Sequence, residues 1–210
     1  MSQMSYVRDG AEIYRRSFTL IRTEADLDGF DPILERTVVR MIHACGMVDL
    51  AADVAASPGF AKAATRALAA GAPILTDTQM VASGVTRSRL PAANEVVCML
   101  SDPRVAGEAA RLGTTRTAAA VSLWGDRLDG AIAVFGNAPT ALFHLLELLA
   151  GGAAQPAAVI GVPVGFIGAA ESKAALASFH PMVEHLVVHG RRGGSAIAAA
   201  AVNALASDSE

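Results

Sequence analysis

Residues 131–168 read AIAVFGNAPTALFHLLELLAGGAAQPAAVIGVPVGFIG, and the architecture of the chain can be worked out from them. The apolar run 131–135 is followed by a helical stretch over 138–150, and a second apolar run covers 157–161. Uninterrupted hydrophobicity over such short runs is typical of strands that are buried on both faces. The stretch therefore predicts a strand–helix–strand unit, which joins parallel strands of one sheet.

The same pattern recurs on either side of this unit. Further apolar runs lie at 73–77, 95–100 and 185–189. Further helices are expected at about 10–26, 31–46, 58–70, 102–112, 115–128, 168–177 and 194–206. We therefore expect an α/β protein: a three-layer α/β/α sandwich with a five-stranded parallel sheet and the N-terminal helices packed on it. Its length of 210 residues suits a single domain over 1–210.

Composition and charge exclude several classes of protein. The 20 acidic and 17 basic residues give a net charge of −3, which argues against a nucleic-acid-binding protein. The uncharged run 148–170 is long enough to cross a bilayer, but its glycines and prolines do not suit a membrane helix. Cys45 and Cys98 suggest no disulfide framework, and the N-terminal residues lack the apolar region of a signal peptide. We expect a soluble cytoplasmic protein.

Arginine dominates the basic residues, since Lys62 and Lys173 are the only lysines in the sequence. A bias in the coding sequence would explain this preference. The planar guanidinium fork is also well suited to binding carboxylate groups of a ligand. The two explanations are compatible.

Common catalytic and cofactor motifs fit this chain poorly. The glycines of 161–168 do not follow the dinucleotide-binding fingerprint, and Lys173 is misplaced for a phosphate-binding P-loop. This loop could instead hold a carboxylate on backbone N–H groups. His185 and His189 bracket an apolar strand, and no dense cluster of metal-ligating residues is present in the sequence. We expect no metal and no cofactor.

His43 is the candidate for acid–base chemistry. Cys45 is two residues away, so the two side chains point about 200° apart around a helix and cannot form a thiolate–imidazole pair. A lone histidine near a helix end can simply cap the last carbonyl groups. It can also act as the single proton donor of a site, because its pKa lies near neutrality.

Seven segments together carry a resemblance to a known family. They are MIHACG (41–46), GAPILTD (71–77), GVTR (84–87), LPAANEV (90–96), GNAPTAL (136–142), GVPVGFIGAAESK (161–173) and GRRGGS (190–195). In this order and spacing they resemble the precorrin-8X methylmutase family, over nearly the whole chain from Tyr6 to about Ala206. Ala93 departs from the family pattern, which often has glycine before the asparagine.

The resemblance implies a flavodoxin-like parallel sheet, a homodimer, and an isomerase without metal or organic cofactor. The implied reaction, in cobalamin biosynthesis, converts precorrin-8X into hydrogenobyrinate by a 1,5-sigmatropic methyl shift from C-11 to C-12. His43 is implied as the acid that protonates the macrocycle. The implied substrate-contacting residues are Ser17, Arg40, Thr86, Arg87 and Arg116. Arg40 precedes His43 by three residues, so both lie on one helix face.

The resemblance also suggests an active site shared across the dimer, with Arg116 reaching towards the partner's His43. The helix that Arg116 begins has small apolar residues that would suit subunit packing, namely Ala118, Ala119, Ala120, Val121 and Leu123. Two alternatives stay open: a corrinoid carrier without catalytic activity, and a nucleotide-binding α/β module. Arg87 and Arg116 could also be solvated charges, and Asn137 and Glu171 could either bind ligand or stabilise the fold.

Overall fold

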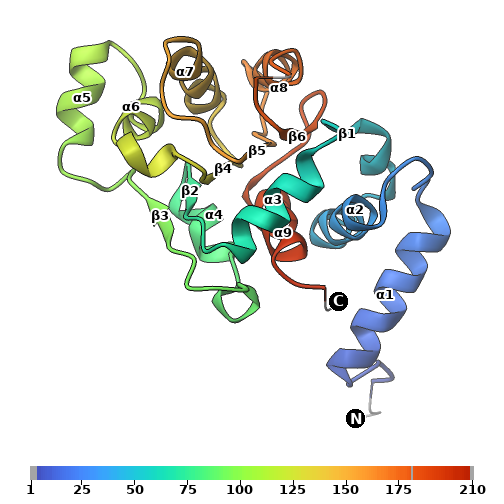
Figure 1. Ribbon diagram of the computed structural model, residues 1–210. Helices are drawn as coiled ribbons and strands as arrows, with labels where there is room; N and C mark the ends of the chain where they lie inside the picture. Colours follow the sequence, from blue (N-terminus) through green and yellow to red (C-terminus); the bar gives the residue numbers. More distant parts are fainter. Residues whose placement is uncertain (1–3, 181, 209–210) are drawn as a thin grey trace.

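The computed structural model describes residues 4–180 and 182–208, which form one six-stranded sheet with helices on both faces (Figure 1). The strands are β1 (Val54–Ala56), β2 (Ile74–Thr76), β3 (Val96–Cys98), β4 (Ile132–Phe135), β5 (Ala158–Gly161) and β6 (His185–Val188). Their order across the sheet is β1-β6-β5-β4-β2-β3. The strands β2 to β6 are parallel and follow the flavodoxin-like order, so the α/β/α prediction and its five parallel strands are confirmed.

The prediction of five strands was wrong by one, because β1 adds an antiparallel strand at the edge of the sheet. Val54 pairs with Val188 and Ala56 with Leu186 of β6. This strand has three residues and follows the 3-10 helix η1 (Val48–Asp53) directly. The sequence around it, DLAADVAAS (49–57), contains no uninterrupted apolar run like those of β2 and β3, so only its pairing with β6 defines it.

Two layers of helices cover the sheet (Figure 1). One layer contains α2 (Pro32–Cys45), α3 (Phe60–Ala69), α4 (Gln79–Gly84) and α9 (Ser195–Leu205). The other contains α6 (Arg116–Ser122), α7 (Pro139–Ala150) and α8 (Ala169–Ala177), with α5 (Val105–Leu112) beside α6. Among residues 4–180 and 182–208, no helix is long and apolar enough to cross a membrane.

Alternating residues of each strand fill the two cores. In β4, Ile132 and Val134 belong to the core under α2 and α9, whereas Ala133 and Phe135 belong to the core under α7. All four side chains are fully buried. This explains the uninterrupted apolar run in the sequence, because both faces of the strand are covered.

The expected helices differ from the structure in two places. α1 (Gly10–Glu24) packs on α2 rather than on the sheet, and in Figure 1 it stands at one end of the molecule. The helix expected over 115–128 ends at Ser122, and a separate 3-10 turn, η3 (Gly125–Leu128), follows it. Gly125 has a φ of 52°, which a continuing α-helix would not allow.

Candidate active site

The last turn of α2 carries His43, and both ends of this helix are fixed by their caps. The side chain of Asp31 accepts backbone N–H bonds at the first turn, where Pro32 is pre-organised for helix. Gly46 ends the helix in the left-handed conformation, with a φ of 71°. The imidazole therefore projects from a rigid position beside α1.

Ser17 of α1 contacts His43 directly. The Oγ of Ser17 lies 2.8 Å from His43 Nδ1, a hydrogen-bonding distance. A hydroxyl can donate to a neutral Nδ1 and can also accept from a protonated one. Ser17 can therefore hold the ring in either protonation state, and Nε2 is left as the nitrogen that would meet a ligand.

Two aromatic rings of α1 surround the same imidazole. The ring centroid of Tyr14 lies 5.2 Å from that of His43, and Phe18 lies 5.1 Å away in an edge-on orientation. The guanidinium of Arg40 lies over the Phe18 ring, 5.6 Å from its centroid. The structure thus brings together Ser17, Arg40 and His43, as the sequence predicted, and adds Tyr14 to them.

The pKa of His43 is lowered from its usual value. Partial burial is the larger cause, because it disfavours the charged form, and the positive charge of Arg40 lowers the pKa further. Both causes disfavour the protonated form, so the imidazolium of His43 is a stronger acid than a histidine in solvent. Burial also raises the pKa of the Cys45 thiol, which contacts the carbonyl of Ile42 at 3.6 Å, so Cys45 is no thiolate nucleophile.

A cavity of about 320 Å³ opens in front of His43. Its walls come from α1, α2, α4 and α9 and from the turn after α4. The lining residues are Tyr14, Arg40, His43, Ala44, Gly84, Thr86, Ala196, Ala199, Ala200 and Asn203. The walls are thus small, apolar side chains with a few polar groups, a composition typical of ligand sites.

The position of Thr86 in this cavity is set by α9. Asn203 accepts the backbone N–H of Thr86 at 2.8 Å and donates to the carbonyl of Gly84 at 3.0 Å. Gly84 lies so close to α9 that a Cβ there would be 2.6 Å from the Cβ of Ala199. Glycine at position 84 therefore lets α4 and α9 approach and brings Thr86 to the cavity.

Arg87 lies on the exposed 3-10 turn η2 (Arg87–Arg89) next to this cavity. The adjoining hollow of about 290 Å³ is lined by Ser88 and Arg89 of the same turn, together with Tyr14, Arg40 and Thr86. The structure thus places Arg87 near the site without including it in these walls. Its contact with substrate stays a prediction.

Arg116 lies far from His43 within the same chain. It starts α6 in the opposite helical layer (Figure 1), is exposed, and its Nη2 approaches the carbonyl of Leu100 at 3.5 Å. The prediction that the apolar face of α6 packs against a second subunit was wrong. Residues 118–121 are buried within the subunit, because α5 and α7 pack against them.

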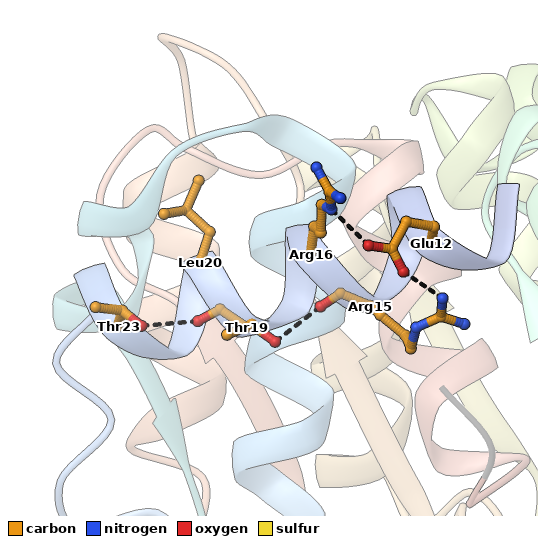
Figure 2. Close-up of a pocket in the computed structure, with 6 residues that line it drawn as sticks. All are labelled: Glu12, Arg15, Arg16, Thr19, Leu20 and Thr23. Atoms are coloured by element: carbon orange, nitrogen blue, oxygen red, sulfur yellow. Dashed lines mark hydrogen bonds and ion pairs between the residues drawn. The ribbon is translucent and has the colours of Figure 1, made fainter. Parts of the chain in front are cut away.

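Another hollow, of about 340 Å³, lies on the outer side of α1 and is lined by residues of that helix alone (Figure 2). Glu12 pairs there with Arg15 and Arg16, and Thr19 and Thr23 bond to carbonyl groups one turn earlier. The polar side chains of this hollow thus form their ion pairs and hydrogen bonds within the helix. The hollow therefore offers no chemistry that competes with the His43 cavity.

The structure gives no support to the nucleotide-binding alternative. In this topology ligands bind where the order of the strands reverses, here between β2 and β4. The carboxylate of Asp77, 2% exposed, occupies this position and accepts the N–H groups of Gly136, Asn137 and Ala138. Burial raises the pKa of Asp77, although the three N–H groups favour its charged form. The backbone donors that would hold a phosphate are thus already used by the chain itself.

The glycine-rich segments after β5 and β6 are joined to each other. Lys173 of α8 is fully buried and donates to the carbonyl of Arg192 at 2.6 Å. Burial lowers the pKa of Lys173 to about 8, and the charge of Asp53 opposes this shift. Arg192 in turn pairs with Asp49 and Asp53 of η1. These contacts anchor the carboxyl ends of the strands beside the end of α2.

Four polar lining residues were missed in the sequence: Tyr14, Ser88, Arg89 and Asn203. Tyr14 occurs at helical spacing with Phe18, a pattern that indicates a packing face. Asn203 lies inside an alanine-rich helix, where a single buried amide was the available signal. A helical pattern cannot distinguish a side chain that packs in a core from one that lines a cavity between helices.

Comparisons with known proteins agree with this arrangement. The sequence model of the family described as precorrin-8X methylmutase matches residues 12–208. A precorrin-8X methylmutase of Pseudomonas aeruginosa is 57% identical over 207 residues, which cover 99% of this chain and 100% of the relative. A cobalt-precorrin-8 methylmutase of Priestia megaterium is 36% identical, over 92% of this chain and 86% of the relative.

A solved structure shows the same fold. The crystal structure of precorrin-8X methylmutase from Thermus thermophilus superposes with a TM-score of 0.84 at 42% identity, over 93% of this chain and 94% of the other. The cavity at His43, the flavodoxin-like sheet and the near full-length similarity lead to one conclusion. The chain belongs to the precorrin-8X methylmutase family, whose members are isomerases of cobalamin biosynthesis.

Proposed function

We propose that the protein converts precorrin-8X into hydrogenobyrinate by a 1,5-sigmatropic methyl shift from C-11 to C-12, with His43 as the general acid. The observation that supports this most is the His43 imidazole, held by Ser17 at the wall of a cavity of about 320 Å³. A single positioned proton donor is the catalytic group that an isomerisation without redox change needs.

In this mechanism the protonated His43 gives its proton from Nε2 to a ring nitrogen or to the conjugated system of the macrocycle. The π-system becomes electron-poor, which lowers the barrier to methyl migration. The C-11–methyl bond breaks as the C-12–methyl bond forms. The neutral imidazole then recovers the proton, so that no atom or electron is gained or lost. Loss of the Nε2 proton leaves the neutral tautomer with N–H at Nδ1, so Ser17 accepts from Nδ1 in both states and Nε2 is free to take the proton back.

The carboxylates of the substrate are proposed to bind Arg40, Thr86 and Arg87, with Ser17 close to the reacting ring. A carboxylate paired with Arg40 offsets the charge that lowers the pKa of His43. Binding of substrate would therefore favour protonation of the group that must act as acid. We further propose that neither a metal nor an organic cofactor takes part.

A cobalt-free substrate is the better supported of the two forms. Relatives named precorrin-8X methylmutase from Pseudomonas aeruginosa and a Sinorhizobium species are 57% and 56% identical to this chain. The cobalt-precorrin-8 methylmutase of Salmonella typhimurium is 40% identical. The expected cytoplasmic location and single-domain organisation stay predictions.

We also propose a homodimer whose active sites are shared. Arg116 is exposed and lies in the layer opposite His43, so it can meet a substrate carboxylate only at the site of another subunit. Since residues 118–121 are buried within the subunit, the contact between subunits has to use other surfaces.

The test is to incubate the protein with precorrin-8X and to record visible spectra. An isomerase converts the pale substrate into an orange corrin, whereas a carrier binds it without that change and a nucleotide-binding module does not bind it. The variant His43→Ala should bind the corrinoid and lose the methyl shift. Thr23→Ala, on the outer side of α1, is the matched control. Near-normal turnover by His43→Ala would contradict the proposal that His43 is the general acid.

A further inference from the structure

Tyr14 is shared by the cavity at His43 and by two further hollows. In the described part of the chain the volumes of the three are about 320, 410 and 290 Å³. The residue is 47% exposed, so part of its ring is open to anything that enters these hollows. The largest of the three is bounded otherwise by Ala11, Arg15 and Phe18, all from α1.

The buried part of the same ring is in contact with the proposed acid. The centroids of Tyr14 and His43 are 5.2 Å apart with an interplanar angle of 38°, and Tyr14 is 5.7 Å from Phe18. Aromatic pairs at such separations attract each other beyond simple burial. Ser17 fixes the imidazole through Nδ1, and the Tyr14 ring limits the rotation of the imidazole plane.

We propose that Tyr14 is both a positioning residue for His43 and the aromatic surface on which the conjugated ring of the substrate rests. The proposal rests on the proposed function, because it takes a flat macrocycle as the ligand. A flat, conjugated ring gains most from an offset stack on an exposed aromatic face. Since Tyr14 touches His43, a macrocycle stacked there is held next to the proton that it must receive.

The alternative is that Tyr14 only packs α1 against α2. In that case its substitution would lower stability and leave ligand binding and kcat unchanged. The affinity for hydrogenobyrinate and kcat, measured beside the melting temperature, separate the two. The NMR chemical shifts of the His43 ring protons report the contact between the two rings, because an aromatic ring shifts the signals of protons stacked on it.

The variants are Tyr14→Leu and Tyr14→Phe, with Ile13→Ala as the matched control. Ile13 is the neighbouring residue on α1, has a similar exposed fraction of 45%, and lies outside the walls of these hollows. Tyr14→Leu should weaken hydrogenobyrinate binding about three- to tenfold and lower kcat, since the ring is lost. Tyr14→Phe keeps the ring and should recover most of both losses.

The His43 ring-proton signals should move in Tyr14→Leu and stay in place in Tyr14→Phe and Ile13→Ala. Unchanged affinity and unchanged kcat in Tyr14→Leu would overturn the proposal, as would an equal effect of Ile13→Ala. A different result would contradict the proposed function, namely that the unsubstituted protein leaves precorrin-8X unconverted. Hydrogenobyrinate binding by the variants would still decide the role of Tyr14.

Discussion

Ser17 Oγ lies 2.8 Å from His43 Nδ1, and a hydroxyl can donate to this nitrogen or accept from it. Sequence resemblance suggested Ser17 as a substrate contact, whereas its observed partner is the proposed acid itself. We propose that Ser17 is a positioning residue, whose effect on the substrate passes through the orientation of the imidazole. This distinction has a measurable consequence.

Replacing Ser17 with alanine should lower kcat by roughly three- to tenfold, the range expected for loss of one hydrogen bond. The affinity for substrate should change little, because the carboxylate-binding groups remain. Steady-state kinetics separates the two parameters. Thr19→Ala removes a hydroxyl from the outer side of α1 and should leave both unchanged. A rise in KM with an unaltered kcat would instead identify Ser17 as a substrate contact.

The charge of Arg40 leads to a prediction about the pH dependence of activity. Its charge lowers the pKa of His43, so Arg40→Gln should raise this pKa towards the ordinary histidine value. The active form is protonated, and activity therefore falls as the pH rises through the pKa. In Arg40→Gln the fall in kcat/KM should occur at higher pH, although substrate binds more weakly. A pH profile for the free enzyme tests this, and an unchanged or lower midpoint would contradict it.

Single side chains were predicted from the sequence where a motif carried them. His43 and Thr86 lie in short segments whose order is specific to the family, Arg40 directly precedes one of these segments, and the structure brings all three to one cavity. Tyr14 and Asn203 lie in helices whose pattern indicates packing alone. Their role depends on the space between α1, α2 and α9, which no local pattern describes.

The close approach of α4 and α9 is an element-scale feature that one substitution can test. A Cβ at position 84 would lie 2.6 Å from the Cβ of Ala199, so Gly84→Ala forces the two helices apart. We expect a loss of about 1–3 kcal/mol in the free energy of unfolding, the usual cost of overpacking. Because Thr86 follows directly, substrate affinity should also fall.

The matched control is Gly107→Ala in α5, where a Cβ would meet no atom within 4 Å. Alanine is favoured over glycine inside a helix, so this variant should gain about 0.5–1 kcal/mol. Denaturant titrations of the two variants give both values. Equal effects at the two positions would show that contact with Ala199 does not determine the response.

The elements were predicted best where the sequence pattern is long. The five parallel strands and the helix 138–150 follow from apolar runs and their spacing, and the structure confirms them. β1 escaped prediction because the alanine-rich sequence around it is interrupted by Asp53 and contains no such run. α4 escaped prediction because its six residues are too few to show a helical period. The apolar face of α6 was recognised, but the helices that cover it were not. Burial under α5 and α7 and burial under a second subunit produce the same pattern.

For the whole molecule, the proposed shared site predicts complementation between inactive subunits. His43→Ala and Arg116→Ala should each be nearly inactive alone. If Arg116 acts on the other subunit, a mixed dimer has one site with both lesions and one intact site, because the interface is symmetric. Mixing should then restore part of the activity, measured from the visible spectrum.

If Arg116 works within its own subunit, every site in the mixture carries a lesion and no activity returns. Subunit exchange has to be shown independently, with one variant labelled. No recovery of activity after verified exchange would rule out the shared site. The shared site would also be ruled out if the active protein is monomeric at assay concentrations.

The pairing of β1 with β6, and the packing of α2 on α9, join the first quarter of the chain to its last. During synthesis, α2 and His43 leave the ribosome long before Val188 and Asn203 do. Until then the side of α2 that packs on α9 has no partner, and the wall of the cavity formed by α9 does not exist. Folding must therefore wait for contacts between residues far apart in sequence, which form slowly. Catalytic competence is thus one of the last properties that the growing chain acquires, although its proposed acid is among the first residues made.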